Sequence, residues 1–189
     1  GVEHTVIPDR IEAGTFMAAA ALAGEGVTLR RICRDHMKAI TEAIIASGHR
    51  IDFNEAGDTC TIHRSEETKG CDLVTSPYPG YPTDMQAQMT ALLATTPGIS
   101  VIKDTIFPQR FMHCSELKRM GADIKVDNGT AVVRGVAHLS AAPVMASDLR
   151  ASAALVLAAL KAKGSTEISR LYHIDRGYGH IGEKVIMLG

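Results

Sequence analysis

One carboxylate of this chain, that of Asp84, lies where local structure could hold it firmly enough for chemistry. The stretch around it, SPYPGYPTDMQAQM at 76–89, places three prolines and a glycine before Thr83 and a helix-like run directly after Asp84. Prolines and glycine interrupt regular structure, and Thr or Asp before an apolar-periodic run is typical of a helix start. The carboxylate either caps this helix, which contributes about 1 kcal/mol, or acts as a catalytic base.

Other charged residues recur at matching places along the chain. Asp148 opens a later helix as Asp84 does, and Arg150 lies in the first turn of that helix. Arg110 and Arg176 lie in the segments DTIFPQRFMH and LYHIDRGY, each between an expected strand and an expected helix. Each arginine alone is better explained as a solvated side chain or a local ion pair. Because guanidinium groups and helix N-termini both bind anions, the set as a whole indicates one site for an acidic, phosphorylated substrate beside a proton-accepting carboxylate.

The elements that would position these residues repeat along the chain. Three segments, beginning at Pro8, Thr83 and Ser147, each contain a leading aspartate, an Ala-rich helix and a glycine-marked exit into a β-branched strand. In the first two, a second helix and a strand pair follow, and the turn Asp127-Asn128-Gly129 is a strong hairpin signal for the second pair. Each full unit therefore reads β-α-β-α-β-β, an α/β pattern.

We place these repeats at roughly 1–68, 69–138 and 139–189 of a single domain. The third repeat is incomplete, because 178–189 reads as its second helix and ends at a glycine where the others turn into a strand pair. The chain also begins at Gly1 without a methionine. We therefore expect a piece of a longer protein, whose incomplete unit leaves apolar surface or a strand edge open.

Composition limits the classes of function. With 46% hydrophobic and 22% charged residues, the chain reads as an ordinary soluble globular protein. The net charge is −1 and there is no tryptophan, so we expect no nucleic acid and no anionic membrane among its partners. The longest apolar stretch, at 16–24, is too short to span a bilayer, and no signal peptide is evident.

The cysteines and histidines show no metal-binding pattern. The four cysteines form no CxxC pair and the eight histidines form no HxxxH. We expect no metal and no cofactor. Isolated thiols favour a reducing compartment, so we expect a cytoplasmic protein.

Two motif matches carry no function. The run at 177–182 fits GxGxxG, but it lacks the βαβ unit and the later acidic residue that a dinucleotide-binding domain needs. The run at 115–118 fits SxxK without the supporting β-lactamase motifs, and nothing near Cys114 would lower its pKa enough to make it a nucleophile.

Five ordered motifs carry a resemblance to a known family over nearly the whole chain. They are HTVIPDRIEAGTF, YPTDMQAQM, TIFPQRFMH, VMASDLRASAALVLA and LYHIDRGY. This set resembles the enolpyruvyl transferases, and more closely the members that act on UDP-N-acetylglucosamine in peptidoglycan synthesis than those of the shikimate pathway. The resemblance implies an inside-out α/β barrel domain built from three βαβαββ repeats, the third incomplete here.

The resemblance also implies a reaction and roles for residues. The enolpyruvyl group of phosphoenolpyruvate would pass to the 3-hydroxyl of UDP-N-acetylglucosamine by addition and then elimination of phosphate. Asp84 matches the carboxylate at the sugar hydroxyl, where it would act as the base while also capping its helix. Ile106 matches a backbone contact to the nucleotide sugar, with Phe107 beside it.

The remaining matches concern the second substrate. Arg150 and Arg176 match the guanidinium groups that hold the phosphate and carboxylate of phosphoenolpyruvate, and Arg110 matches an arginine at the closing cleft. Asp148 matches a catalytic carboxylate near the reacting carbons.

Two departures from the family pattern shape the expectation. Pro108 stands where a glutamate commonly follows the Ile-Phe pair, and none of the four cysteines lies in a segment like the family's proton-donating loop. We therefore expect roughly the C-terminal half of an enzyme, inactive without a complementary N-terminal domain as its partner. The alternative is a stand-alone module that binds nucleotide sugars or anions without catalysis.

Overall fold

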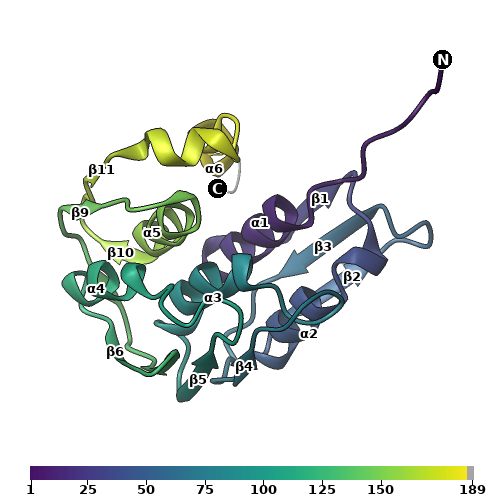
Figure 1. The fold of residues 1–189 in the computed structure, drawn as a ribbon. Coiled ribbons are helices and arrows are strands. Elements are labelled where there is room, and N and C mark those ends of the chain that lie inside the picture. Colours follow the sequence, from purple (N-terminus) through teal and green to yellow (C-terminus); the bar gives the residue numbers. More distant parts are fainter. Residues whose placement is uncertain (187–189) are drawn as a thin grey trace.

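Three helices form the centre of the computed structural model, which describes residues 1–186. They are α1 (Arg10–Ala23), α3 (Gln86–Leu93) and α5 (Leu149–Lys161), and each packs against the other two (Figure 1). All eight residues of α3 are buried, the polar Gln86, Gln88 and Thr90 among them, because α1 and α5 both pack against this helix. The alanines of α1 and α5 have small side chains, so these helices can lie close together. The predicted Ala-rich helices are confirmed.

The segment predicted as the first repeat contains a three-stranded antiparallel sheet in the order β1-β3-β2. Its elements are β1 (Val27–Arg30), η1 (Arg34–His36), α2 (Lys38–Ala46), β2 (Arg50–Phe53) and β3 (Thr59–His63). The short helix α2 connects β1 to β2 and packs on α1. The second helix and strand pair expected from the sequence are therefore present.

The segment predicted as the second repeat contains a four-stranded sheet in the order β4-β5-β7-β6. Its elements are β4 (Leu73–Val74), η2 (Thr83–Met85), β5 (Ile99–Lys103), α4 (Met112–Arg119), β6 (Asp123–Asp127) and β7 (Thr130–Arg134). The hairpin predicted between the last two strands is confirmed, because Asn128 and Gly129 both have positive φ and Asp127 pairs with Thr130.

The two sheets match except at one edge. Strands β1, β3 and β2 correspond in order and direction to β5, β7 and β6, whereas β4 has no counterpart in the first sheet. The leading strand predicted for the first repeat is wrong, since 1–9 has no regular structure and the side chains of Val2, Val6 and Ile7 are exposed. A strand is stabilised by its ladder partner, and this segment extends away from the free edge of β1 (Figure 1).

The segment predicted as the third repeat contains two short parallel strand pairs. In each pair one strand precedes α5 in the chain and the other follows it. Strand β8 (Leu139–Ser140) pairs with β10 (Ala162–Lys163), and β9 (Val144–Met145) pairs with β11 (Ile168–Ser169). The chain then forms η3 (Leu171–Arg176) and α6 (Ile181–Ile186). The second helix predicted at 178–189 thus starts three residues later than expected, and its predicted end at Gly189 lies outside the described residues.

The chain is a mixed α/β protein, as predicted. A small buried cluster of Ala153, Ile174 and Tyr178 fixes η3 and the following turn onto α5.

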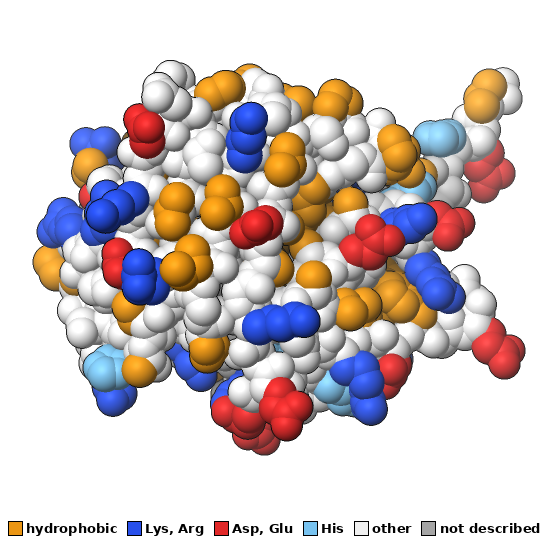
Figure 2. All heavy atoms as spheres, turned by 90° about the horizontal axis from the view of Figure 1, so that it is seen from below, with side chains coloured by type: hydrophobic (Ala, Val, Ile, Leu, Met, Phe, Trp, Pro, Cys, Tyr) orange, Lys and Arg blue, Asp and Glu red, His pale blue; other side chains and the backbone are white. Residues whose placement is uncertain are grey.

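All four cysteines are free, and no described helix is long and apolar enough to cross a membrane. Acidic and basic side chains are interspersed over the face in Figure 2, with apolar side chains between them.

Candidate active site

Asp84 lies in the 3₁₀ turn η2, where its two carboxylate oxygens each accept a hydrogen bond from an arginine. Arg110 donates from Nη1 to Oδ1 over 2.7 Å, and Arg150 donates from Nη2 to Oδ2 over 3.1 Å. The prediction that Asp84 caps its helix is wrong, because no side chain caps η2 or α3. The backbone of the turn closes on itself instead, with the amide of Met85 donating to the carbonyl of Pro82.

Asp148 does cap a helix. Its Oδ1 accepts hydrogen bonds from the amides of Arg150 at 2.9 Å and Ala151 at 3.0 Å, which satisfies donors at the start of α5. Asp9 has the same role at the start of α1, where it accepts from Ile11 and Glu12. Arg150 thus bonds to Asp148 through its backbone amide and to Asp84 through its guanidinium group, so one residue at the helix start contacts both aspartates.

The two guanidinium groups determine the charge state of Asp84. Burial opposes ionisation of this carboxyl group, but the hydrogen bonds and charges of Arg110 and Arg150 outweigh it and lower the pKa of Asp84. The carboxylate is therefore ionised at neutral pH. Both of its oxygens are already occupied by cationic donors, which makes it a weak base until one of them moves.

A buried hydroxyl holds the other side of Arg150. The guanidinium donates from Nη1 to the hydroxyl of Tyr178 over 3.0 Å, and that hydroxyl lies 2.8 Å from Oγ1 of Thr15. Gln88 donates to both oxygens. Although burial disfavours the charged guanidinium, its contacts with Tyr178 and Asp84 raise the pKa of Arg150. Our sequence analysis missed Tyr178, Thr15 and Gln88. Polar side chains within apolar helical runs could have indicated Thr15 and Gln88, whereas no local signal marked Tyr178.

Asp104 shapes the segment that contains Ile106 and Phe107. This aspartate is 2% exposed, and its Oδ1 accepts hydrogen bonds from the amides of Ile106 and Phe107, both at 2.9 Å. Its Oδ2 accepts from the hydroxyl of Thr83, the neighbour of Asp84, over 2.7 Å. A backbone contact from Ile106 to a ligand would therefore have to use its carbonyl oxygen. Sequence analysis also missed Asp104, although an aspartate two residues before a bend is a recognised turn signal.

The other predicted residues differ in how the structure places them. Arg110 lies in the loop between β5 and α4, with its guanidinium carbon 5.7 Å from the centre of the exposed Phe107 ring. Pro108 packs beside the β6–β7 hairpin, since a Cβ on Gly129 would come within 2.8 Å of it. Arg176 is exposed at the end of η3, and within 1–186 no hydrogen bond or ion pair joins it to the other predicted residues.

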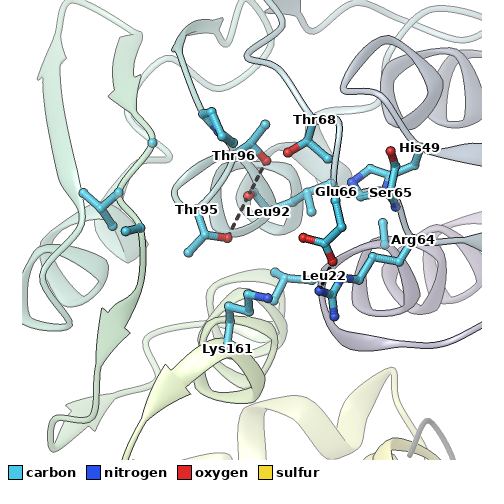
Figure 3. A pocket seen from close by; sticks show the side chains of 15 residues that line it. Leu22, His49, Arg64, Ser65, Glu66, Thr68, Leu92, Thr95, Thr96 and Lys161 are labelled. Carbon is cyan, nitrogen blue, oxygen red and sulfur yellow. Dashed lines mark hydrogen bonds and ion pairs between the residues drawn. The ribbon is translucent and has the colours of Figure 1, made fainter.

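A cavity lies at the other end of the helical core from Asp84 and Arg150. This cavity, of about 400 Å³, is lined by residues that include Leu22, Leu92 and Lys161, from the C-terminal ends of α1, α3 and α5 (Figure 3). Its Arg64 pairs with Glu66, and within the described residues Nε2 of His49 has no hydrogen-bond partner. None of the predicted site residues reaches this cavity, and no group of three potential metal ligands occurs within 1–186.

The matching family model defines the class of protein to which this fold and site belong. A model of "EPSP synthase (3-phosphoshikimate 1-carboxyvinyltransferase)" matches residues 1–185. The chain therefore belongs to the EPSP synthase family, which confirms the resemblance to enolpyruvyl transferases.

Individual relatives narrow the comparison. UDP-N-acetylglucosamine 1-carboxyvinyltransferase of Akkermansia muciniphila is 72% identical over the whole chain, which covers 44% of that relative. The corresponding transferase 1 of Caldanaerobacter subterraneus subsp. tengcongensis is 51% identical over the whole chain, which covers 45% of it. The chain thus spans less than half the length of the curated relatives it matches.

Solved structures agree with the fold. The enolpyruvyl transferase NikO from Streptomyces tendae superimposes with a TM-score of 0.86 at 28% identity, over 98% of this chain and 44% of that one. EPSP synthase from Acinetobacter baumannii gives a TM-score of 0.66 at 18% identity over 87% of this chain and 40% of that one, which shows the fold alone.

Proposed function

We propose that the chain forms part of an enolpyruvyl transferase that moves the enolpyruvyl group of phosphoenolpyruvate to the 3-hydroxyl of UDP-N-acetylglucosamine. This is the first committed step of peptidoglycan synthesis. The observation that carries the substrate assignment is the 72% identity to a relative named for this reaction. The cluster of Asp84, Arg110 and Arg150 supports it, because it combines a carboxylate with two cationic groups that can bind a phosphorylated acid.

We infer that the domain is an inside-out α/β barrel of three βαβαββ repeats, at roughly 1–68, 69–138 and 139–189. Two observations support this arrangement. The three first helices of the repeats pack together at the centre, and the first two repeats carry sheets whose shared strands have the same order. The site then lies where the N-terminal ends of α3 and α5 meet, since η2 leads into α3 and Arg150 is in the first turn of α5.

Asp84 is the proposed base for the sugar hydroxyl. With both oxygens bonded to guanidinium groups it has little capacity to take a proton, so a contact must open first. An anionic substrate competes with Asp84 for these guanidinium groups, because its phosphate and carboxylate oxygens bind them as well. Moving a cation from Asp84 to the substrate raises the pKa of this carboxyl group and makes it a stronger base. Binding of one substrate thereby prepares the base for the other.

The arginines are proposed to stabilise phosphate as it leaves. Arg150, Arg176 and Arg110 are the proposed ligands of phosphoenolpyruvate, and fixed cations stabilise the charge that develops as phosphate departs. Asp148 is the proposed second catalytic carboxylate. Its Oδ1 is used by the helix cap, and among the described residues its Oδ2 has one hydrogen-bond contact, with Ser147 at 3.4 Å. Ile106 and Phe107 are proposed to contact the nucleotide sugar.

We further propose that a complementary N-terminal domain of the same enzyme supplies the opposing wall of the site. The addition step needs a proton donor for the methylene carbon, and closure of the two walls would exclude water. Coverage of only 44% of the relatives supports a shared site, and the four free cysteines support a cytoplasmic location. The chain alone should then be inactive.

Phosphate release from phosphoenolpyruvate with UDP-N-acetylglucosamine tests this function. The assay compares the chain alone, the chain mixed with a separately produced complementary half, and the same mixture carrying Asp84→Asn. We expect release only from the unmodified mixture. Robust turnover by the chain alone would show that the site is not shared. Silence of a mixture of two folded halves that still binds the nucleotide sugar would favour a binding module without catalysis.

A further inference from the structure

The hydroxyl group of Tyr178 contacts all three central helices. Tyr178 has no exposed surface, and its oxygen lies within hydrogen-bond distance of Thr15 on α1, Gln88 on α3 and Arg150 on α5. Thr15 and Gln88 are likewise buried, at 1% and 0% exposure. The network therefore links one side chain from each central helix to the segment between η3 and α6.

The positions of the protons in this network follow from the chemistry of its members. Thr15 donates its hydroxyl proton to the carbonyl of Ile11 over 2.8 Å, so its oxygen can only accept from Tyr178. Arginine has no acceptor, so Arg150 must donate to Tyr178. Gln88 donates from Nε2 over 3.3 Å. The Tyr178 oxygen therefore accepts two hydrogen bonds and donates one, which fills its capacity.

This arrangement fixes the orientation of Arg150. Its Nη1 is bonded to Tyr178 while its Nη2 is bonded to Asp84, so the guanidinium bridges a neutral and an anionic partner. The ring of Tyr178 also lies 5.8 Å from the guanidinium carbon. Without the hydroxyl, Nη1 would be left unpaired at a side chain that is only 14% exposed. Both amino groups then turn onto Asp84 as a bidentate pair, in which Nη1 shares Oδ1 with Arg110.

We propose that Tyr178 is a positioning residue that keeps Nη1 of Arg150 from joining Nη2 on Asp84 and so keeps this amino group available to an anionic substrate. The inference rests on the proposed function, in which Arg150 binds phosphoenolpyruvate. Tyr178 acts only through Arg150 and touches no reacting atom. Thr15 supports it by accepting the hydroxyl proton, which leaves both lone pairs of the Tyr178 oxygen for Arg150 and Gln88.

The test uses Tyr178→Phe in the full-length enzyme. We expect the KM for phosphoenolpyruvate to rise about tenfold or more, because hydrogen bonds to charged groups contribute enough for such a change. The KM for UDP-N-acetylglucosamine should stay within about twofold, since the nucleotide sugar is not assigned to Arg150. A purely structural role would lower Tm and leave the ratio of the two KM values unchanged.

Matched variants separate positioning from packing. Tyr172→Phe makes the same chemical change at a side chain in η3 that is 62% exposed, and it should behave as the unmodified enzyme. Thr15→Val removes the acceptor of the Tyr178 proton and should raise the same KM by a smaller factor, whereas Thr15→Ser should restore it. The Thr15 pair also decides the question if Tyr178→Phe fails to fold.

A crystal structure of the Tyr178→Phe enzyme separates failure of this inference from failure of the proposed function. Arg150 found bidentate on Asp84 would support positioning, whatever the enzyme turns over. Arg150 found in its original orientation would overturn it. Turnover by the unmodified enzyme with an unchanged KM in Tyr178→Phe would also overturn positioning and leave the function intact, whereas no turnover by the unmodified enzyme would overturn the function.

Discussion

The starts of α3 and α5 occupy the same place in the proposed repeats, but their aspartates are used differently. One carboxylate oxygen of Asp148 accepts hydrogen bonds from two backbone amides of α5. Asp84 makes no bond to the helix that follows it, and both of its oxygens bind guanidinium groups. The difference arises in the approach to each helix, because the 3₁₀ turn η2 precedes α3 and its backbone hydrogen bonds occupy the amides of Met85 and Gln86.

The comparison shows which carboxylate is free to change partners. A capping carboxylate is held by amides that cannot leave without unwinding the helix. An ion-paired carboxylate is held by side chains that an anionic substrate can attract away. We therefore propose that Asp84, rather than Asp148, accepts the proton, and that the cap at Asp148 is the firmer element that aligns Arg150.

The largest effect is expected from replacing Asp84, the ion-paired carboxylate of this comparison. Asp84→Asn keeps the shape of the side chain but removes the base, so kcat of the full-length enzyme should fall about 10²–10⁴-fold in the phosphate-release assay. Stability should change little, because the carboxylate is 36% exposed and ion pairs near the surface contribute little. Activity within tenfold of the unmodified enzyme would show that Asp84 is not the base.

A pH titration extends the comparison to His113. The pKa of this buried histidine is affected by Asp148 at the start of α5 and by Arg110, a partner of Asp84. Burial lowers the pKa of His113 to about 4; the field of Asp148 raises it and that of Arg110 lowers it. Below pH about 6.5 the unfolded chain takes up a proton that folded His113 refuses, so stability is complete above 6.5 and is lost as pH falls towards 4. The free energy of unfolding should drop by about 3 kcal/mol over this range.

Urea unfolding at a series of pH values measures this drop. His113→Gln should flatten the dependence between pH 7 and 4, while His138→Gln at an exposed position controls for the loss of a histidine. Equal slopes in His113→Gln and the unmodified protein would contradict the assignment.

The smallest expected effect concerns the cap itself. Asp148→Ala should lower the free energy of unfolding by about 1 kcal/mol, as Asp9→Ala should at the matching start of α1. Asp148→Asn should remain close to the unmodified protein, because asparagine caps helices as well as aspartate. Thermal unfolding of the three variants provides the measurement. If Asp148→Asn were as unstable as Asp148→Ala, the charge rather than the cap would be the stabilising feature.

Local chemistry accounts for what sequence analysis predicted correctly. The α/β pattern, the Ala-rich helices and the Asn128-Gly129 hairpin depend on residues that are neighbours in the chain. Asp148 was also placed correctly at a helix start. The leading strand at 1–9 failed for the opposite reason, since an extended segment becomes a strand only when another strand accepts its hydrogen bonds.

The sequence alone therefore determined the elements and the residue types, whereas only the tertiary structure decided which charges meet. Asp84 is 26 residues from Arg110 and 66 from Arg150, and Thr15 is 163 from Tyr178. No local pattern reports such pairings, because they depend on how α1, α3 and α5 pack and on where η3 lies against α5. The same packing buries Tyr178, and burial makes its hydroxyl bonds to Arg150 and Thr15 costly to lose.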